Sequence, residues 1–137
     1  MKNVISAPLN AVLGTIHIPS SKSISNRMLI IRALAGSSIS LQNLSESDDT
    51  VVLSKVLDND EAVKDVGHAG TAMRFLAAYL TTQPAEVILT GSQRMKQRPI
   101  GPLVDALKQV GARIKYMENE GCPPLRISGG ALTGGSL

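Results

Sequence analysis

The sequence predicts an α/β fold built from repeated units, and three observations support this fold class. Segments with the two-residue period of strands alternate with segments whose apolar residues recur every three to four positions. The order helix, strand, helix, strand occurs once from residue 23 and again from residue 70. One constant shift also superposes Arg27 on Arg74 and Leu29 on Leu76. Such repetition indicates a domain assembled from similar units.

The composition is that of an ordered globular protein. The chain has 137 residues, a length that suits one domain, with 43% hydrophobic and 18% charged residues. One Phe, two Tyr and no Trp argue against binding single-stranded nucleic acid by base stacking. The net charge of +3 is also small for a nucleic-acid-binding protein. We therefore expect no nucleic-acid partner.

Nothing in the sequence indicates export, membrane insertion or metal binding. The N-terminal residues lack a basic segment followed by a long apolar one, and no apolar run approaches the roughly 18 residues of a spanning helix. Cys122 is the only cysteine, which excludes an intrachain disulfide. His17 and His68 lie far apart without metal-ligand spacing. We expect a cytoplasmic protein without a metal or a membrane partner.

The first part of the chain predicts two helices with a strand between them. Residues 4–18 have the composition of extended chain. Apolar spacing predicts a helix over 23–35 that ends at a glycine. Residues 38–44 alternate like a strand with one buried face. Serine and two acids at 47–49 then predict the capped start of a helix that runs to residue 57.

The middle of the chain predicts a strand, a buried helix and a second strand. The strands are expected at 62–66 and 86–90. Residues 71–80 are apolar on all sides except at Arg74, which predicts a buried helix. Because an isolated buried charge is costly, we expect a carboxylate or a bound anion to neutralise Arg74.

The last part predicts a helix followed by two paired strands. Pro99 suits the first position of a helix that ends at Gly111. Residues 113–117 and 125–128 are expected to pair as antiparallel strands around a turn at 119–122.

The first candidate site lies where the segment 19–27 enters a helix. Lys22, Ser23, Asn26 and Arg27 fall on the first turns, and spacings of four place them on one patch. A helix N-terminus has unpaired N–H groups and a positive dipole end, so added cations favour phosphate or carboxylate. The alternative is a serine-capped surface helix with solvated charges.

Two further junctions have similar character. Glycines at 67 and 70 precede the second helix of the repeat, and three cations fall within 94–98. Both have ordinary explanations, as turn residues and as a solvated loop, and His68 is interpreted as a turn or capping residue. The phosphate-loop pattern of NTPases is absent, and neither a nucleophile–His–acid set nor a carboxylate pair can be assembled.

Four motifs occupy residues 19–27, 48–50, 69–74 and 94–101. Taken in this order, they resemble the N-terminal portion of the 3-phosphoshikimate 1-carboxyvinyltransferase (5-enolpyruvylshikimate-3-phosphate synthase) family. The resemblance implies two similar domains, each made of three βαβαββ units of the enolpyruvyl transferase fold, with about one and a half to two units present here. It also implies that residues 19–137 are a partial N-terminal domain, and that residues 1–18 form an extended segment belonging to the other domain.

The resemblance implies transfer of the enolpyruvyl (carboxyvinyl) group of phosphoenolpyruvate to the 5-hydroxyl of 3-phosphoshikimate, with release of phosphate. This reaction belongs to the shikimate pathway of chorismate and aromatic amino-acid biosynthesis and uses no metal or organic cofactor. The implied partners are the two small-molecule substrates and the remainder of the same enzyme chain. The acid–base groups of the family lie beyond Leu137, so we expect no catalytic residue in this chain and no turnover by it alone.

Motif matching assigns expected roles residue by residue. Lys22 would contact both substrates, Ser23 and Arg27 would bind 3-phosphoshikimate, and Gly70 and Arg98 would hold phosphoenolpyruvate. Residues expected to support these contacts are Asn26, Asp49, Thr71, Arg74 and Lys96.

The sequence departs from the family pattern in two notable ways. Only residues 51–66 separate the motif at 48–50 from Gly67, where family members usually carry two further strands, so the first unit looks abbreviated. Phe75 stands where proline is usual. We expect Phe75 to shift its helix and alter sensitivity to glyphosate, the family's phosphoenolpyruvate-site inhibitor. Other departures are Ser20, His68 and Gln97.

Two alternatives remain open from the sequence. The related transferase acting on UDP-N-acetylglucosamine shares the fold and the donor, but usually has Lys-Asn where this chain has Lys22 and Ser23. The second alternative is a non-catalytic anion-binding module that has kept the fold alone.

Overall fold

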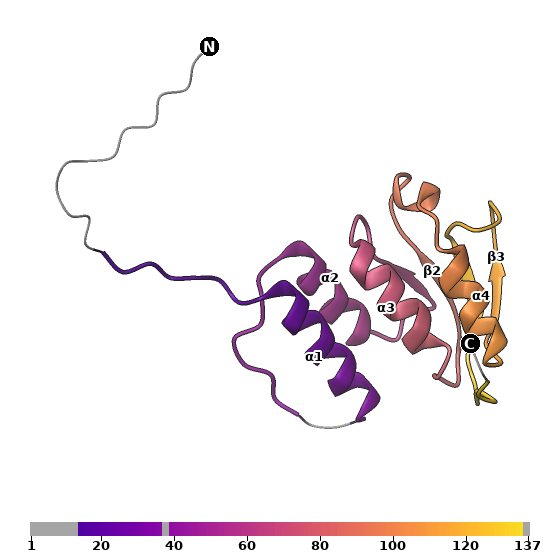
Figure 1. Cartoon of the computed structure of the whole chain (residues 1–137), viewed down its shortest axis with the longest axis horizontal. Coiled ribbons are helices and arrows are strands. Elements are labelled where there is room, and N and C mark those ends of the chain that lie inside the picture. The colour runs from indigo at the N-terminus through magenta and orange to yellow at the C-terminus, as the bar shows by residue number, and fades with distance from the viewer. Residues whose placement is uncertain (1–13, 37–38, 136–137) are drawn as a thin grey trace, which may run out of the picture.

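The structure is a computed structural model that describes residues 14–36 and 39–135. It contains one four-stranded mixed sheet with helices beside it (Figure 1). The strands lie in the order β1-β2-β4-β3. Their bounds are β1 Val63–Asp65, β2 Glu86–Thr90, β3 Arg113–Tyr116 and β4 Leu125–Ser128. All four strands were expected from the sequence, each at its observed place.

The sheet and two helices make one complete βαβαββ unit. Strands β1 and β2 pair in parallel and are connected through α3 (Gly70–Leu80). Helix α4 (Gly101–Gln109) follows β2, and β3 and β4 then form the expected antiparallel pair. Strand β4 also pairs antiparallel with β2, which brings the last strand to the middle of the sheet.

Before this unit the structure has two helices and, over residues 14–36 and 39–62, no strand. The helices are α1 (Lys22–Leu34) and α2 (Asp48–Leu57). The strand predicted for 38–44 is therefore wrong over 39–44, because this segment pairs with no other strand and leaves Ile39 exposed. Residue 38 lies outside the described residues. The first unit is indeed abbreviated, and the described residues before β1 form two helices and no sheet.

The N-terminal extended segment is described only in part. Residues 14–18 form neither helix nor strand and lead toward α1 from one side of the molecule (Figure 1). Residues 4–13 of the predicted segment lie outside the described residues.

Local sequence signals explain where α1 and α2 begin. The Ser21 hydroxyl oxygen accepts a hydrogen bond from the Ile24 backbone N–H at 3.4 Å and caps α1. Asp48 and Asp49 occupy the first turn of α2, where the helix dipole favours negative charge. Ser47 occupies the N-cap position, but its hydroxyl contacts the Thr50 hydroxyl at 3.0 Å instead of capping a backbone N–H.

Two sequence expectations about α3 and α4 need correction. Helix α4 begins at Gly101, and the proline in its first turn is Pro102 and not Pro99. Arg74 is exposed instead of buried, because it lies on the one face of α3 that the core does not cover. Its guanidinium donates to the backbone carbonyls of Gly70 (3.3 Å) and Pro99 (3.2 Å), so it needs no carboxylate.

The core lies between the helices and one face of the sheet. Helices α3 and α4 pack on the strands, whereas α1 and α2 pack on each other and on α3 (Figure 1). The largest fully buried apolar side chains are Leu29, Leu53, Val66, Met73, Leu76, Leu89, Met95, Val104, Leu125 and Ile127. No helix in the described part of the chain is long and apolar enough to cross a membrane.

The outer face of α1 is apolar and exposed. Ile24, Met28, Ile31 and Leu34 recur at helical spacing, with exposed fractions from 37% for Met28 to 65% for Ile24. Ile31 and Leu34 of this stripe also line an apolar groove of about 530 Å³ between α1, α3 and α4. Such a surface favours association in water.

We predict that the isolated 137-residue chain self-associates through the outer face of α1. Burying one such side chain contributes about 1.5–3 kcal/mol, so the double change Ile31→Glu and Leu34→Glu should raise the dissociation constant at least tenfold. Analytical ultracentrifugation measures this constant. Val51→Glu is the matched control, because Val51 is 56% exposed on α2 and outside the stripe. Equal weakening by both changes would contradict the prediction.

Candidate anion-binding site

A polar hollow of about 400 Å³ forms where α1, α2 and α3 begin. Lys22 is the first residue of α1, Asp49 the second of α2 and Gly70 the first of α3. The full lining is Lys22, Asp49, His68, Gly70, Thr71, Arg74, Phe75 and Arg98. Six of these were predicted as site residues, from segments that lie far apart in the sequence.

The charge of the hollow favours anions. Lys22, Arg74 and Arg98 oppose the single carboxylate of Asp49. The Lys22 amine lies 3.8 Å from an Asp49 carboxylate oxygen, and about half of the Lys22 side chain remains exposed. Helix N-termini add unpaired N–H groups and positive dipole ends. A phosphate or carboxylate here would therefore meet three cations and helix N–H groups against one carboxylate, Asp49.

Arg98 lies directly over Gly70. A Cβ atom built on Gly70 would be 2.6 Å from Arg98 Nη1 and 3.3 Å from Cζ. The absence of a side chain at residue 70 therefore makes room for the guanidinium. None of the ion pairs within residues 14–36 and 39–135 uses Arg74 or Arg98, so both guanidinium groups keep charge available to a ligand.

Arg27 and Ser23 lie beside the hollow and do not line it. The Arg27 guanidinium donates to the Ser23 carbonyl at 2.9 Å, and its carbon lies 5.8 Å from the centre of the Phe75 ring. Arg27 instead lines the apolar groove, which shares Phe75 with the hollow. Phe75 thus separates Arg27 from the other predicted cations.

The remaining predicted residues have structural partners. Asn26 is fully buried beneath α1 and accepts a hydrogen bond from the Thr50 hydroxyl at 2.7 Å. Lys96 forms an ion pair with Glu118 at 2.7 Å. Neither side chain lines the hollow.

His68, expected only as a turn or capping residue, lies in the site, and a neighbouring hollow was not predicted from the sequence. His68 lines the anion hollow, and its Nδ1 lies 2.9 Å from the Ser92 hydroxyl oxygen. A second hollow of about 280 Å³ lies between His68, Arg94, Met95 and Arg98. The sequence did contain a signal for His68. It lies two residues before Gly70, and glycine at that position already indicated that the backbone comes close to a ligand.

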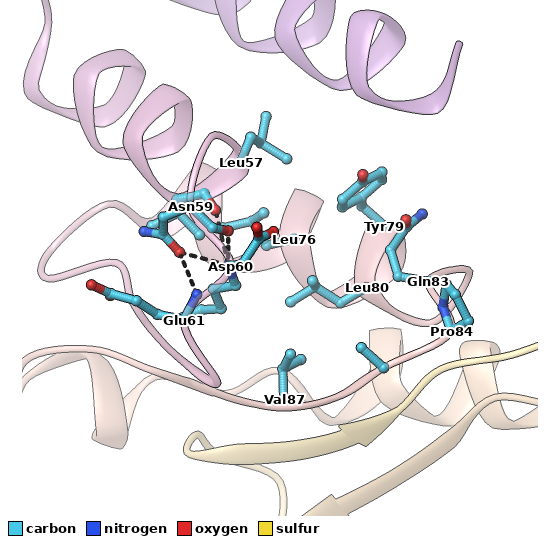
Figure 2. Close-up of a pocket in the computed structure, with 13 residues that line it drawn as sticks. Leu57, Asn59, Asp60, Glu61, Leu76, Tyr79, Leu80, Gln83, Pro84 and Val87 are labelled. Carbon is cyan, nitrogen blue, oxygen red and sulfur yellow. Dashed lines mark hydrogen bonds between the residues drawn. The ribbon is translucent and has the colours of Figure 1, made fainter. Parts of the chain in front are cut away.

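Another cavity, of about 290 Å³, lies at the far ends of α2 and α3 (Figure 2). Its one cation, Lys64, is buried and donates to the Val56 carbonyl at 3.3 Å, to the Asn59 side-chain oxygen at 2.6 Å and to the Asn59 carbonyl. Because these acceptors use its amine fully, Lys64 holds the turn after α2 in place. Asp60 and Glu61 also line this cavity, which makes it unsuited to anions.

Nothing in the described part of the chain indicates a metal centre. Within residues 14–36 and 39–135, no group of three or more His, Cys, Asp and Glu side chains could hold a metal ion.

Fold and hollow together define an α/β protein that gathers cations and helix N-termini around one polar site. The family model described as EPSP synthase (3-phosphoshikimate 1-carboxyvinyltransferase) matches residues 7–59 and 52–137. These two segments include nearly the whole chain, so the chain belongs to the EPSP synthase family.

Relatives of the chain carry the same description. A 3-phosphoshikimate 1-carboxyvinyltransferase of Bacteroides fragilis (strain YCH46) is 52% identical over 137 residues, which are 100% of this chain and 33% of that protein. One from Pseudoalteromonas atlantica is 41% identical over 157 residues, covering 95% of this chain and 36% of that protein. This chain thus spans about a third of the length of the curated relatives it matches.

Solved structures support the same fold. An EPSP synthase from Acinetobacter baumannii superposes with a TM-score of 0.71 at 22% identity, covering 85% of this chain and 32% of that one. A second structure of EPSP synthase from this organism gives a TM-score of 0.70 at 21% identity.

The comparisons also locate the shortened first unit. The alignment with a relative from Shewanella sediminis needs 163 positions for the 137 residues of this chain, whereas the Bacteroides fragilis alignment needs 137. The family model matches in two segments that overlap at residues 52–59, so the match is interrupted near α2. The Bacteroides fragilis protein has the same spacing as this chain, since its alignment needs no extra positions.

We predict that Gly70→Ala weakens anion binding without unfolding the protein. The new Cβ meets only the flexible end of Arg98, so the guanidinium moves and affinity for inorganic phosphate falls about tenfold, as expected for one charge-assisted hydrogen bond. The melting temperature should stay equal or rise slightly, because alanine favours a helix. Isothermal titration and a thermal melt measure the two effects.

Gly91→Ala provides the contrast. A Cβ at residue 91 would lie 2.7 Å from the Gly67 carbonyl oxygen and 2.9 Å from Met95 Cβ, and backbone cannot move aside as a side-chain end can. This change should cost roughly 1–3 kcal/mol of stability. A Gly70→Ala protein that loses as much stability as Gly91→Ala would argue against the role assigned to Arg98.

Proposed function

We propose that this chain is the N-terminal part of an enzyme that transfers the carboxyvinyl group of phosphoenolpyruvate to the 5-hydroxyl of 3-phosphoshikimate and releases phosphate. The supporting observation is that Lys22, Arg74 and Arg98, from separate segments, line one hollow at three helix N-termini. Family membership and the names of the relatives agree with this reaction. We place the enzyme in the cytoplasm.

The charge of the substrates explains why such a hollow is needed. Phosphoenolpyruvate carries a phosphate and a carboxylate, and 3-phosphoshikimate carries the same two groups. Bringing them together requires cations that offset their mutual repulsion and hold both in a reactive orientation. We assign phosphoenolpyruvate to the hollow between Lys22, Gly70 and Arg98, with Thr71 and Arg74 supporting its walls.

We assign 3-phosphoshikimate to a neighbouring subsite that involves Lys22, Ser23 and Arg27. Ser23 is exposed one position after Lys22, and Arg27 lies one turn further along α1. Arg27 has its present partners in the Ser23 carbonyl and the Phe75 ring, so it would have to turn from Phe75 toward a bound phosphate.

The rest of the site lies in the remainder of the enzyme. We assign residues 19–137 to a partial N-terminal domain and residues 1–18 to an extended segment of the other domain. The acid–base groups of the reaction would follow Leu137, and closure of the second domain would exclude water from the hollow.

We predict that a full-length enzyme containing this segment releases phosphate from phosphoenolpyruvate only when 3-phosphoshikimate is present, and that the 137-residue chain alone does not. Arg98→Ala should lower kcat/KM for phosphoenolpyruvate on the order of a hundredfold, because a preorganised cation is lost. A phosphate-release assay measures both. Lys115→Ala is the control, since it removes an exposed cation from β3. Normal turnover by the isolated chain would refute the assignment of the missing groups.

We predict that Phe75→Pro changes glyphosate inhibition of the full-length enzyme. Phe75 lines the hollow, and proline at this interior position of α3 removes a backbone N–H and bends the helix beside Arg74. The inhibition constant against phosphoenolpyruvate measures the change. Phe75→Leu, which removes the ring and keeps the helix, distinguishes backbone from side-chain effects. Equal inhibition of the wild-type and Phe75→Pro enzymes would dispose of the idea.

A further inference from the structure

Helix α1 is polar on its inner side near the anion hollow, which is unusual for a packed helix. Ser25 and Asn26 are buried against α2 and its preceding loop, with Asn26 0% exposed, while apolar Ile24 and Met28 face outward. Buried polar groups require partners, and a well-packed apolar contact would stabilise the pair of helices at least as well. The polar contact therefore needs an explanation other than stability.

The buried groups form two hydrogen-bonded connections from α1, one to the first turn of α2 and one to the loop before it. The Thr50 hydroxyl donates to Asn26 Oδ1 at 2.7 Å, and both residues are almost fully buried. The Ser45 backbone N–H donates to the Ser25 hydroxyl oxygen at 2.9 Å. The Ser47 hydroxyl lies 3.0 Å from that of Thr50 and extends the first connection.

These connections lie directly beneath the charged pair of the hollow. Asn26 follows Lys22 by one helical turn, and Thr50 follows Asp49 by one residue. The Lys22 amine and an Asp49 carboxylate oxygen are 3.8 Å apart. Apolar contacts are non-directional and allow one helix to slide on another, whereas a hydrogen bond fixes distance and angle. A slide of one residue, about 1.5 Å, would break the connection and move Lys22.

The unpaired half of the Asn26 amide supports a role in positioning. Asn26 Nδ2 is buried and has no hydrogen-bond partner among the described residues. A buried unpaired donor opposes folding, so this asparagine is a poor choice if stability is its purpose.

We propose that the hydrogen bond from Thr50 to Asn26 fixes the register of α1 against α2 and thereby holds Lys22 beside Asp49 in the lining of the anion hollow. Thr50 and Asn26 are positioning residues that act through Lys22 and need no contact with substrate. The proposal deepens the proposed function and depends on it for the identity of the ligand, phosphoenolpyruvate.

The test compares variants of the full-length enzyme. Thr50→Val removes the hydroxyl and keeps the shape, Thr50→Ser keeps the hydroxyl, and Thr50→Cys is used if the valine variant fails to fold. Thr81→Val is the matched control, because Thr81 is equally buried but its hydroxyl donates to the Ala78 carbonyl within its own segment. The melting temperature, KM and kcat are measured for each variant.

Thr50→Val should raise KM for phosphoenolpyruvate at least tenfold, because displacing a binding group by about 1 Å can weaken an enzyme roughly a hundredfold. The variant protein should still melt cooperatively. Thr50→Ser should restore KM to near the wild-type value. Thr81→Val should lower the melting temperature and leave KM unchanged.

The second part of the test places Thr50→Val in a Lys22→Ala background. There it should raise KM no further, because the two changes remove the same interaction. Unchanged KM in Thr50→Val, or a further loss in the Lys22→Ala background, would overturn the proposal.

A crystal structure of the Thr50→Val variant gives a result that depends on no ligand. The Lys22 amine and the Asp49 carboxylate should separate beyond roughly 4 Å, the usual limit of an ion pair. If they separate while the wild-type enzyme shows no turnover, the positioning role holds and the proposed function fails. If the pair stays at its present distance, the positioning role fails whatever the enzyme does.

Discussion

Mutual repulsion between Lys22, Arg74 and Arg98 is the constraint that the surrounding structure must satisfy. Three cations and three helix N-termini converge on one hollow, and one carboxylate, Asp49, partly balances them. Such a cluster does not form by its own electrostatics. It depends on the apolar packing beneath it, where Leu29 and other fully buried side chains hold the helices together. As in other binding sites, favourable packing in the core thus offsets the unfavourable electrostatic free energy of the site.

Phe75 connects two surfaces of different character. On one side its ring lines the charged hollow, and on the other it lines the apolar groove beside Arg27. A change in what covers the groove would therefore act on a wall of the hollow and on the partner of Arg27. The two surfaces cannot be considered separately, although one is suited to small anions and the other to apolar side chains.

Most elements could be predicted from the sequence, because caps and apolar periodicity are local properties. Residues 39–44 could not, since alternation makes a strand only where a partner strand exists. The convergence of Lys22, Arg27 and Arg98 was predicted from junction chemistry and family resemblance. The hollow contains Lys22 and Arg98, whereas Arg27 lies beside it and lines the apolar groove. The salt-bridged state of Lys96 and the buried role of Thr50 were not predictable, because both depend on partners brought close only by folding.

The first unit has no strand over residues 14–36 and 39–62, and this has an evolutionary consequence. Helices α1 and α2 are attached to the body through α3, and the hollow is built from these three helices and from the two loops that hold His68 and Arg98. Strands next to α1 and α2 can therefore be lost during evolution without removing any residue that lines the hollow. Genetic insertion and loss should accordingly be tolerated in the turn that follows α2, at residues 58–62, and natural variation in chain length should concentrate there.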